Sequence, residues 1–339
     1  MKICVIHSGG TIGMTKTSRG YATKKGFFAA ELQKFAPLNG EGMPQYHLIE
    51  LPVILDSSNV SLAQWNEIGS VIFQNYKDYD GFVVLHGTDT LCYTASALSF
   101  MFEGLDKPVI LTGSQIPFCE SNSDAGENLI YSFRLAAHKS LKEVCVCFGG
   151  TLLRGNRATK VSADALAAFA SPNFAPLAKW KRDGKVRINK KYLLKRSAQA
   201  FSFHPFEAFP IAVLKVFPGI QFDIFENILK PELKGIVLEA FGSGNVPQGD
   251  NGLTRLLAKA KENGTAIVIV TQCLQGNARL GLYEASSTLK DFGAISGFDM
   301  TAESAVCKLY HLLSLGFEGE SLAAMMEKNL RGEITSDKL

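Results

Sequence analysis

The sequence predicts an α/β fold: a doubly wound, mostly parallel sheet in an N-terminal domain, followed by a smaller α/β C-terminal domain. Short apolar runs rich in Val and Ile alternate with segments whose apolar residues recur at helical spacing, which is typical of parallel strands covered by helices. The 339 residues suffice for two domains at about 100 to 200 residues each. We expect these domains at 1–184 and 209–339, with a basic linker at 185–208.

The first predicted strand, residues 2–8, leads into a glycine turn, Gly-Gly-Thr-Ile-Gly at 9–13. This turn places Thr11 at the carboxyl end of the strand. Its glycine spacing matches neither the dinucleotide-binding fingerprint nor the P-loop. Residues 14–21 are polar and contain glycine, and they predict a mobile surface loop that carries Tyr21.

A second apolar run, at 51–55, is followed by a small polar cluster of Asp56, Ser57 and Ser58. A capping-box pattern at 61–64 predicts that a helix begins directly afterwards. This strand, like the first, therefore delivers short polar side chains to the carboxyl edge of the sheet.

The third run, at 81–85, is apolar and β-branched, and His-Gly-Thr-Asp-Thr at 86–90 separates it from a segment of helical spacing at 91–102. A strand, a glycine turn and a helix N-terminus therefore meet at Thr88 and Asp89. Ligands bind at such points in open α/β sheets, because the free N–H groups of the helix point into the crevice. Taken alone, these two residues would more often be helix caps.

The same alternation continues through both predicted domains. In the first domain, further strands are predicted at 108–112 and 144–148, with a helix at 124–137. In the second domain, strands at 211–217, 235–241 and 265–271 alternate with helices at 222–228, 253–263 and 302–313. Strands that alternate with helices predict parallel sheets in both domains.

The positive charge of the chain is concentrated in one segment. The formal net charge is +3, and residues 179–196 hold nine Lys or Arg against the single Asp183. A basic segment can bind nucleic acid, but this one has few aromatic residues and no nucleic-acid-reading motif. We therefore interpret it as a solvated linker or an edge hairpin, and we expect no nucleic-acid partner.

The cysteines and apolar runs indicate a globular protein of a reducing compartment. Seven cysteines, an odd number, are scattered mostly within apolar runs, which argues against a disulfide framework. Cys145 and Cys147 share a strand face, but no second pair or nearby His completes a zinc site, so we expect no metal and no cofactor. The N-terminal apolar run is too short for a signal peptide, and no run reaches the roughly 18 residues of a membrane span. We expect a cytoplasmic protein that does not associate with membranes.

The turn residues suit a pocket for a small zwitterion. Thr11 could be a nucleophile, but a threonine hydroxyl needs a base to activate it. Lys160, which follows a Gly-Asn turn, is the candidate base. Asp89 could bind an α-ammonium group, while Ser57 and turn N–H groups could bind an α-carboxylate. Each residue singly has a simpler role, since a turn threonine is common and most lysines are solvated.

Two motifs resemble the signatures of the bacterial L-asparaginase family: Ser8 with the glycine turn at 9–13, and His-Gly-Thr-Asp-Thr at 86–90. Asp-Ser-Ser at 56–58 and Arg-Ala-Thr-Lys at 157–160 fit the same family. The similarity covers nearly the whole chain and is closer to the cytoplasmic type I branch than to the secreted branch. The resemblance implies hydrolysis of L-asparagine to L-aspartate and ammonia through a threonine-linked acyl-enzyme, with the N-terminal domain as the catalytic one.

The resemblance also implies a role for each catalytic residue. Thr11 would match the primary nucleophile, and Tyr21 the flap residue that closes over the substrate. Thr88 would match a second hydroxyl, with Asp89 and Lys160 as its activating partners. Whether Tyr21 or Lys160 removes the proton from Thr11 stays open.

Substrate binding is implied at overlapping positions. The binding residues would be Asp56, Ser57, Ser58, Thr88, Asp89 and Asn245. Asp89 would hold the α-ammonium group of the amino-acid substrate, and backbone N–H groups at the Thr88 turn would stabilise an oxyanion. Asn245 would reach the pocket of a neighbouring subunit, so a homodimer or homotetramer is implied.

Some positions depart from the family pattern. Ser8 stands where the family usually has Thr, a change that keeps a hydroxyl. Glu239 and Phe241 differ from the Arg and Tyr of the type I branch near its allosteric asparagine site, whereas Thr271 and Cys273 are retained. The resemblance therefore supports catalysis better than allosteric control.

Two other functions stay open. A related amidase could act on glutamine or on a tRNA-linked amide, as in the archaeal amidotransferase subunits that share these motifs. A binding protein could instead sense asparagine without hydrolysing it. Release of ammonia from asparagine, glutamine and D-asparagine distinguishes these functions.

Overall fold

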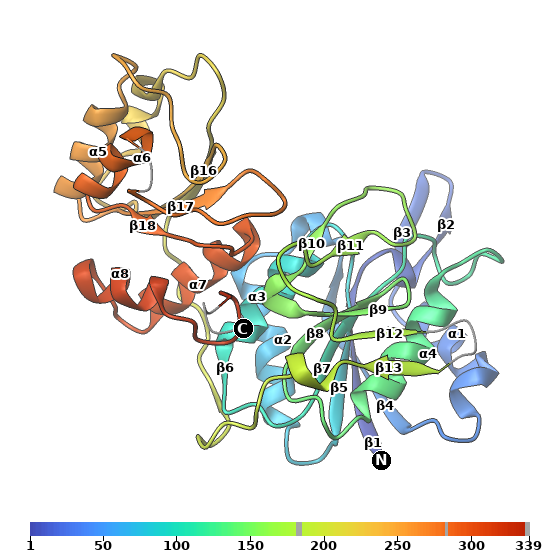
Figure 1. Cartoon of the computed structure of the whole chain (residues 1–339). Coiled ribbons are helices and arrows are strands. Elements are labelled where there is room, and N and C mark those ends of the chain that lie inside the picture. Colours follow the sequence, from blue (N-terminus) through green and yellow to red (C-terminus); the bar gives the residue numbers. More distant parts are fainter. Residues whose placement is uncertain (181–184, 282–283, 336–339) are drawn as a thin grey trace. The chain divides into compact units, whose positions relative to one another are not determined.

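The computed structural model describes residues 1–180, 185–281 and 284–335. It divides the chain into two compact units, Met1–Pro205 and Phe206–Leu339 (Figure 1). Each unit has its own sheet and its own hydrophobic core, as expected of a two-domain chain.

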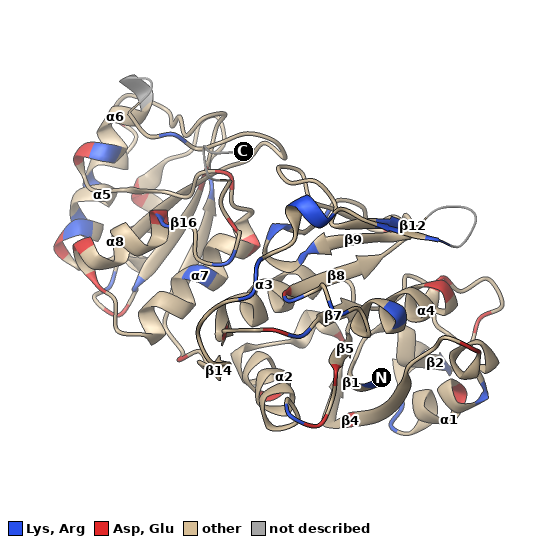
Figure 2. Cartoon of the chain, turned by 60° about the horizontal axis from the view of Figure 1, so that its bottom comes forward, with Lys and Arg blue, Asp and Glu red and all other residues tan. Residues whose placement is uncertain are grey.

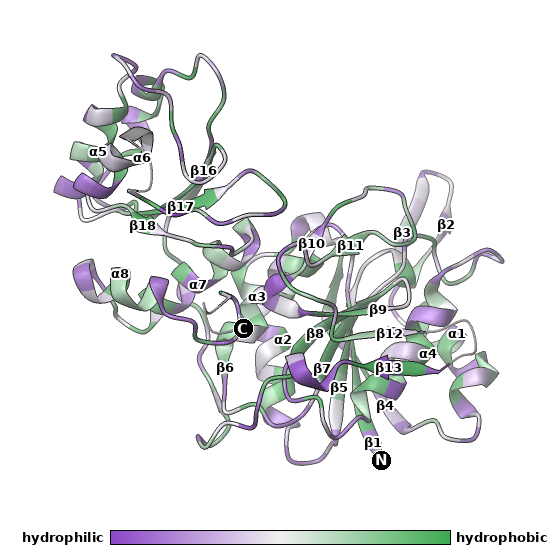
Figure 3. Cartoon of the chain, viewed as in Figure 1, coloured by the Kyte–Doolittle hydropathy of each residue, from purple (hydrophilic) through white to green (hydrophobic). Residues whose placement is uncertain are grey.

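Unit 1 is built on an eight-stranded sheet with the strand order β13-β12-β9-β8-β7-β5-β1-β4. Its parallel strands are β1 (Lys2–Gly9), β4 (Gln45–Leu55), β5 (Gly81–Leu85), β7 (Val109–Thr112) and β8 (Val144–Phe148). Every residue of β5, β7 and β8 is buried, and Figure 3 shows these central strands in hydrophobic colours. Central parallel strands are apolar on both faces because helices cover both sides of the sheet. This sheet confirms the predicted fold class.

Among the described residues of unit 1, the sheet is covered by helices α1 (Phe27–Lys34), α2 (Leu62–Gln74), α3 (Leu91–Met101) and α4 (Ala125–Ala136). On one face, Val5 of β1 belongs to a core cluster with Phe28 of α1 and Phe133 of α4. Helices α2 and α3 lie on the other face (Figure 1). As predicted, α2 begins at a capping box, in which Gln64 Oε1 accepts a hydrogen bond from the Ser61 backbone N–H at 3.1 Å.

The antiparallel edge of the sheet contains the basic segment. β9 (Thr151–Arg154), β12 (Ala178–Trp180) and β13 (Val186–Ile188) extend the sheet beyond β8. β12 and β13 pair antiparallel with each other. Of the two interpretations of the basic segment, a solvated linker or an edge hairpin, this pairing agrees with the edge hairpin. Residues 181–184 lie outside the described residues, and the predicted domain boundaries at 184 and 208 stay a prediction.

The segment after the first glycine turn differs from the prediction. Where we expected a mobile surface loop, β2 (Met14–Thr17) and β3 (Gly20–Thr23) form an antiparallel hairpin with Lys16 opposite Tyr21. Thr17 Oγ1 donates to the Gly20 carbonyl oxygen at 2.6 Å and closes the turn. The loop prediction was wrong because the threonine-rich residues on both sides of the turn form a local strand pair. Threonine favours strands, but the glycine residues were interpreted as signs of a loop.

Short elements complete unit 1. They are η1 (Thr11–Gly13), η2 (Ala36–Asn39), η3 (Ser57–Asn59), β6 (Phe102–Glu103), η4 (Gly155–Arg157), β10 (Thr159–Lys160), β11 (Phe169–Ala170), η5 (Lys190–Tyr192) and β14 (Ser202–Phe203). β10 pairs antiparallel with β11, and β14 pairs antiparallel with β6.

Unit 2 has a four-stranded parallel sheet of β15 (Ile211–Lys215), β16 (Gly235–Ala240), β17 (Ala266–Thr271) and β18 (Ile295–Ser296). Its helices are α5 (Leu253–Glu262), α6 (Glu284–Asp291), α7 (Ala302–Ser314) and α8 (Gly319–Glu327), and the predicted helix at 222–228 is the 3-10 helix η6 (Phe222–Ile228). In Figure 2, charged residues gather on helices and loops and leave most strand positions uncharged. None of the helices in the described ranges has the length and hydropathy needed to cross a membrane.

Candidate active site

Three strand-end turns meet at the carboxyl edge of the unit 1 sheet, where the backbones of Gly10 and Gly87 touch. A β-carbon on Gly10 would lie 2.3 Å from the Gly87 nitrogen, and one on Gly87 would lie 2.4 Å from Ser57 Oγ. Gly10 also has a φ of 85°, in the region that favours glycine. Glycine at these positions therefore lets the turns after β1, β4 and β5 approach one another closely.

Hydrogen bonds from two side chains fasten these turns together. Ser8 Oγ donates to the Leu85 carbonyl oxygen at 2.8 Å and joins the ends of β1 and β5. Thr90 Oγ1 donates to the Ser57 carbonyl oxygen at 2.8 Å and joins the turn after β5 to the turn after β4. The three turns therefore hold fixed relative positions.

A polar pocket of about 210 Å³ opens over this contact. Its lining residues are Gly10, Thr11, Met14, Asp56, Ser57, Gly87, Thr88, Asp89, Gln115, Lys160 and Ala163. All of them belong to unit 1. The structure thus brings together six residues selected from the sequence: Thr11, Asp56, Ser57, Thr88, Asp89 and Lys160.

Lys160 enters the pocket from β10 and contacts two side chains of the turn after β5. Its Nζ donates to Thr88 Oγ1 at 2.9 Å and to Asp89 Oδ1 at 2.7 Å. Thr88 is buried, the Lys160 side chain is 19% exposed, and the Asp89 side chain is 62% exposed. The Lys160 ammonium group orients the Thr88 hydroxyl by donating a hydrogen bond to it. The Asp89 carboxylate balances the positive charge of the ammonium group.

Thr11 opens the short helix η1, directly after β1 and Gly10. Its side chain is partly buried, and its hydroxyl makes no hydrogen bond to any residue that the structure describes. A hydroxyl without a protein partner is available to a ligand in the pocket.

The polar cluster after β4 has a structural role as well as a place at the pocket. Asp56 caps η3, because its Oδ1 accepts from the Ser58 backbone nitrogen and from Ser58 Oγ, each at 3.0 Å. Asp56 and the buried Ser57 line the pocket, whereas Ser58 is not among the lining residues. The Ser58 hydroxyl is therefore committed to Asp56.

Like Ser58, the predicted site residues Tyr21 and Asn245 are not among the residues that line this pocket. Tyr21 is 46% exposed on β3, and its hydroxyl donates to Glu120 Oε1 at 2.7 Å, which raises the pKa of the phenol. Asn245 belongs to unit 2, in a turn after β16 where its backbone nitrogen donates to the Phe241 carbonyl oxygen at 2.8 Å. The roles expected of both residues stay predictions.

Gln115 lines the pocket but was not selected from the sequence. Its Nε2 donates to the carbonyl oxygens of Ala163 at 2.9 Å and Ala165 at 3.2 Å. These bonds hold the segment after Lys160 beside the pocket. The available signal was its position: Gln115 follows β7, which ends at the same edge of the sheet as β1 and β5.

His86, whose orientation the motif left undetermined, is buried beneath the turn and does not line the pocket. Burial lowers its pKa to about 4, against the opposing effect of its hydrogen bond to the Gly87 carbonyl oxygen. The imidazole is therefore neutral at physiological pH and carries no charge under the site.

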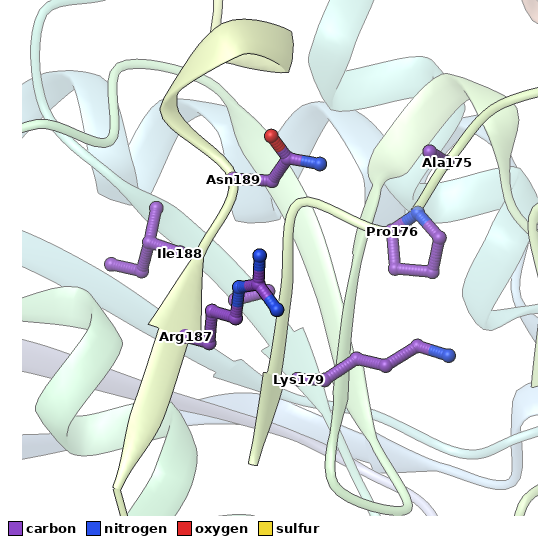
Figure 4. Close-up of a pocket in the computed structure, with 7 residues that line it drawn as sticks. Ala175, Pro176, Lys179, Arg187, Ile188 and Asn189 are labelled. Carbon is purple, nitrogen blue, oxygen red and sulfur yellow. The ribbon is translucent and has the colours of Figure 1, made fainter. Parts of the chain in front are cut away.

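Another pocket, of about 420 Å³, lies at the basic edge of the sheet (Figure 4). Lys179 on β12 and Arg187 on β13 line it, together with Asn189. The charged ends of Lys179 and Arg187 point in different directions (Figure 4). None of these lining residues carries a hydroxyl, whereas the pocket over the glycine turns gathers the hydroxyls of Thr11 and Thr88 beside Lys160 and is taken as the candidate active site.

Two family models match most of the chain. The family model described as "Asparaginase, N-terminal" matches residues 2–193, and the "Glutaminase/Asparaginase C-terminal domain" matches residues 210–326. The chain belongs to the asparaginase family. L-asparaginase 1 of Escherichia coli (strain K12) is 40% identical over 337 residues, which cover 99% of this chain and 98% of the relative.

A solved structure and a more distant relative extend the comparison. The crystal structure of L-asparaginase I from Vibrio cholerae has a TM-score of 0.90 and 40% identity, and the match covers 99% of each chain. Together with the Escherichia coli relative, it confirms the resemblance to the type I branch. A glutamyl-tRNA(Gln) amidotransferase subunit of Methanobrevibacter smithii is 34% identical, and the match covers 98% of this chain and 76% of the relative.

The contact between the glycine turns predicts a large effect of Gly10→Ala. The β-carbon would meet the Gly87 backbone, so we expect unit 1 to lose about 3 kcal/mol or more of unfolding free energy. Gly42 is the matched control, because it has a φ of 81° and no atom lies within 4 Å of the place that a β-carbon would take, so Gly42→Ala should cost only about 1 kcal/mol. Urea unfolding followed by tryptophan fluorescence measures both, since Trp65 and Trp180 lie in unit 1. Equal losses in the two variants would contradict the contact.

The buried His86 predicts a pH dependence of stability. Its pKa is about 4 in the folded chain and 6.5 in the unfolded chain, so only the unfolded chain gains a proton between these values and stability falls as pH falls through that window. Between pH 7 and pH 5 this group should remove about 2 kcal/mol. The His86→Asn variant lacks this imidazole. We therefore expect its unfolding free energy, measured by the same fluorescence method, to fall about 2 kcal/mol less than that of the wild type between pH 7 and pH 5. Parallel pH profiles would refute the assignment.

Proposed function

We propose that the chain hydrolyses L-asparagine to L-aspartate and ammonia through a threonine-linked acyl-enzyme. The observation that carries the proposal is the arrangement, in one small pocket, of a Thr11 hydroxyl that the described residues leave free and the Lys160 ammonium bonded to Thr88 and Asp89. Amide hydrolysis through an acyl-enzyme requires a nucleophilic hydroxyl and a general acid–base group.

In the first step, Thr11 Oγ1 attacks the side-chain amide carbon of asparagine. The hydroxyl proton passes to the leaving amide nitrogen, which departs as ammonia and leaves the aspartyl group esterified to Thr11. Water then attacks the same carbonyl carbon, releases L-aspartate and restores the Thr11 hydroxyl. Backbone N–H groups at the Thr88 turn stabilise the oxyanion that forms in each step.

Thr88, Asp89 and Lys160 act together in proton transfer. The hydrogen bond from Lys160 Nζ to Thr88 Oγ1 connects the second hydroxyl to a group that can hold or release a proton. Asp89 Oδ1 accepts a hydrogen bond from the same Lys160 Nζ at 2.7 Å, so the three side chains form one connected group. We assign Tyr21 as the flap residue that approaches Thr11 when a substrate binds, because its hairpin starts at Met14, a residue of the pocket lining.

The pocket dimensions and charges favour a small amino acid. At about 210 Å³ the pocket is smaller than the roughly 300 to 1,000 Å³ typical of sites for larger ligands. The exposed Asp89 carboxylate binds the α-ammonium group, and Ser57, with Asp56 and Ser58 beside it, lines the α-carboxylate. Free asparagine fits this description better than a tRNA-linked amide does.

The wider assignments follow the family. We infer a cytoplasmic enzyme that works without a cofactor or metal, as a homodimer or homotetramer in which Asn245 serves a neighbouring subunit. No cluster of three or more His, Cys, Asp or Glu suited to a metal occurs among the residues with described positions. An amidase for glutamine or tRNA-linked amides is the alternative, since one relative is named for a glutamyl-tRNA amidotransferase subunit.

Ammonia release by the wild type and by Thr11→Ala tests the proposal. We expect the wild type to prefer L-asparagine over glutamine and D-asparagine, and Thr11→Ala to lower kcat about 1,000-fold or more because the nucleophile is gone. Thr15→Ala, on the adjacent hairpin, is the matched control and should keep wild-type activity. Binding of asparagine without ammonia release by the wild type would instead indicate a sensor, and faster hydrolysis of glutamine the related amidase.

A double-mutant cycle tests whether Thr88 and Lys160 form one unit. We expect Thr88→Val and Lys160→Met each to lower kcat about 100-fold or more, and the double variant to lose little beyond either single change. Lys179→Met, which removes an exposed lysine from β12, should leave kcat unchanged. Losses that multiply in the double variant would show that the two residues act independently.

A further inference from the structure

A chain of hydrogen bonds runs from the helices behind the sheet to the turn that carries Thr88. The Trp65 indole N–H on α2 donates to Thr94 Oγ1 on α3 at 3.0 Å. Thr94 Oγ1 lies 2.9 Å from His86 Nε2, and His86 Nδ1 lies 2.8 Å from the Gly87 carbonyl oxygen. Each of these side chains is at most 8% exposed.

The chemistry of the partners fixes the direction of every bond in this chain. A carbonyl oxygen only accepts, so the His86 proton must be on Nδ1, where it is donated to Gly87. Nε2 of the neutral ring is then an acceptor and takes the Thr94 hydroxyl proton. Because an indole N–H only donates, Thr94 accepts from Trp65 and has its single proton free for His86. One tautomer of the imidazole satisfies all three bonds.

The last bond of the chain determines how the Gly87–Thr88 peptide is oriented. In a trans peptide the carbonyl and the following N–H point in opposite directions. The Gly87 carbonyl points to the buried imidazole, so the Thr88 N–H points away from it, toward the side where Gly87 and Thr88 line the pocket. The Thr88 N–H donates to no backbone or side-chain acceptor among the described residues.

We propose that His86 is a positioning residue, which holds the Gly87–Thr88 peptide so that the Thr88 N–H faces the pocket as a donor to the oxyanion. Trp65 and Thr94 maintain the imidazole tautomer that this role requires. Donation to the Gly87 carbonyl also polarises the peptide and strengthens the N–H as a donor. The inference rests on the proposed amide hydrolysis and names the side chains that hold one of its oxyanion donors in position.

Two His86 variants separate positioning from packing. His86→Leu fills the site but cannot donate to Gly87, whereas the side-chain amide nitrogen of His86→Asn stands close to the place of Nδ1 and can. We expect His86→Leu to lower kcat for L-asparagine about 10- to 100-fold, because a misaligned donor loses part of the effect of an oxyanion-hole group. His86→Asn should recover kcat to within about fivefold of the wild type, and KM should change less than about threefold in both.

Thr94 supplies an independent comparison that leaves His86 in place. Thr94→Val keeps the shape but donates no proton to Nε2, so one of the two hydrogen bonds that select the tautomer is lost and kcat should fall about 3- to 10-fold. Thr94→Ser keeps the hydroxyl and should match the wild type. Because this pair is conservative, it tests the proposal even when His86→Leu does not fold.

The outcomes distinguish this inference from the proposed function. Equal kcat values for His86→Leu and His86→Asn, or for Thr94→Val and Thr94→Ser, would overturn the positioning role, as would losses confined to KM. A wild-type protein that releases no ammonia from asparagine would refute the proposed function itself.

Discussion

The close approach of Gly10 and Gly87 is the constraint on which the rest of the site depends. Parallel strands bring their carboxyl ends to one edge, but ordinary side chains at the turns would hold the backbones apart. With glycine at both positions, the turns touch, and Thr11 and Thr88 follow immediately on either side of the contact. Active-site geometry is therefore set by the packing of one turn backbone against another.

Much of this arrangement could be predicted from local sequence. Strand ends, the glycine turns and the cluster at 56–58 were all visible, because a parallel sheet places the ends of its strands together whatever their distance along the chain. The contact between Lys160 and Thr88 could not be predicted from local patterns, because the position of Lys160 depends on the pairing of β10 with β11. Resemblance to the family supplied that link.

Other features depended on contacts that no local pattern records. The pairing of β2 with β3 was missed because the polar and glycine residues suggested a mobile surface loop. The hydrogen bond from Tyr21 to Glu120 joins positions far apart in the sequence. Gln115 was overlooked because a glutamine at a strand end has no distinctive signature, although its bonds shape one wall of the pocket. These differences all concern segments around the sheet edge and leave the predicted fold class unchanged.

The hairpin β2–β3 is a two-stranded sheet of its own, separate from the eight-stranded sheet. Segments with few buried contacts open at a free-energy cost well below that of global unfolding. A protease would therefore meet the exposed turn between Thr17 and Gly20 well before the core, and a nick there would leave Thr11 and Met14 attached to β1. A chain cut by a protease in this turn would thus still hold the residues of the pocket in place.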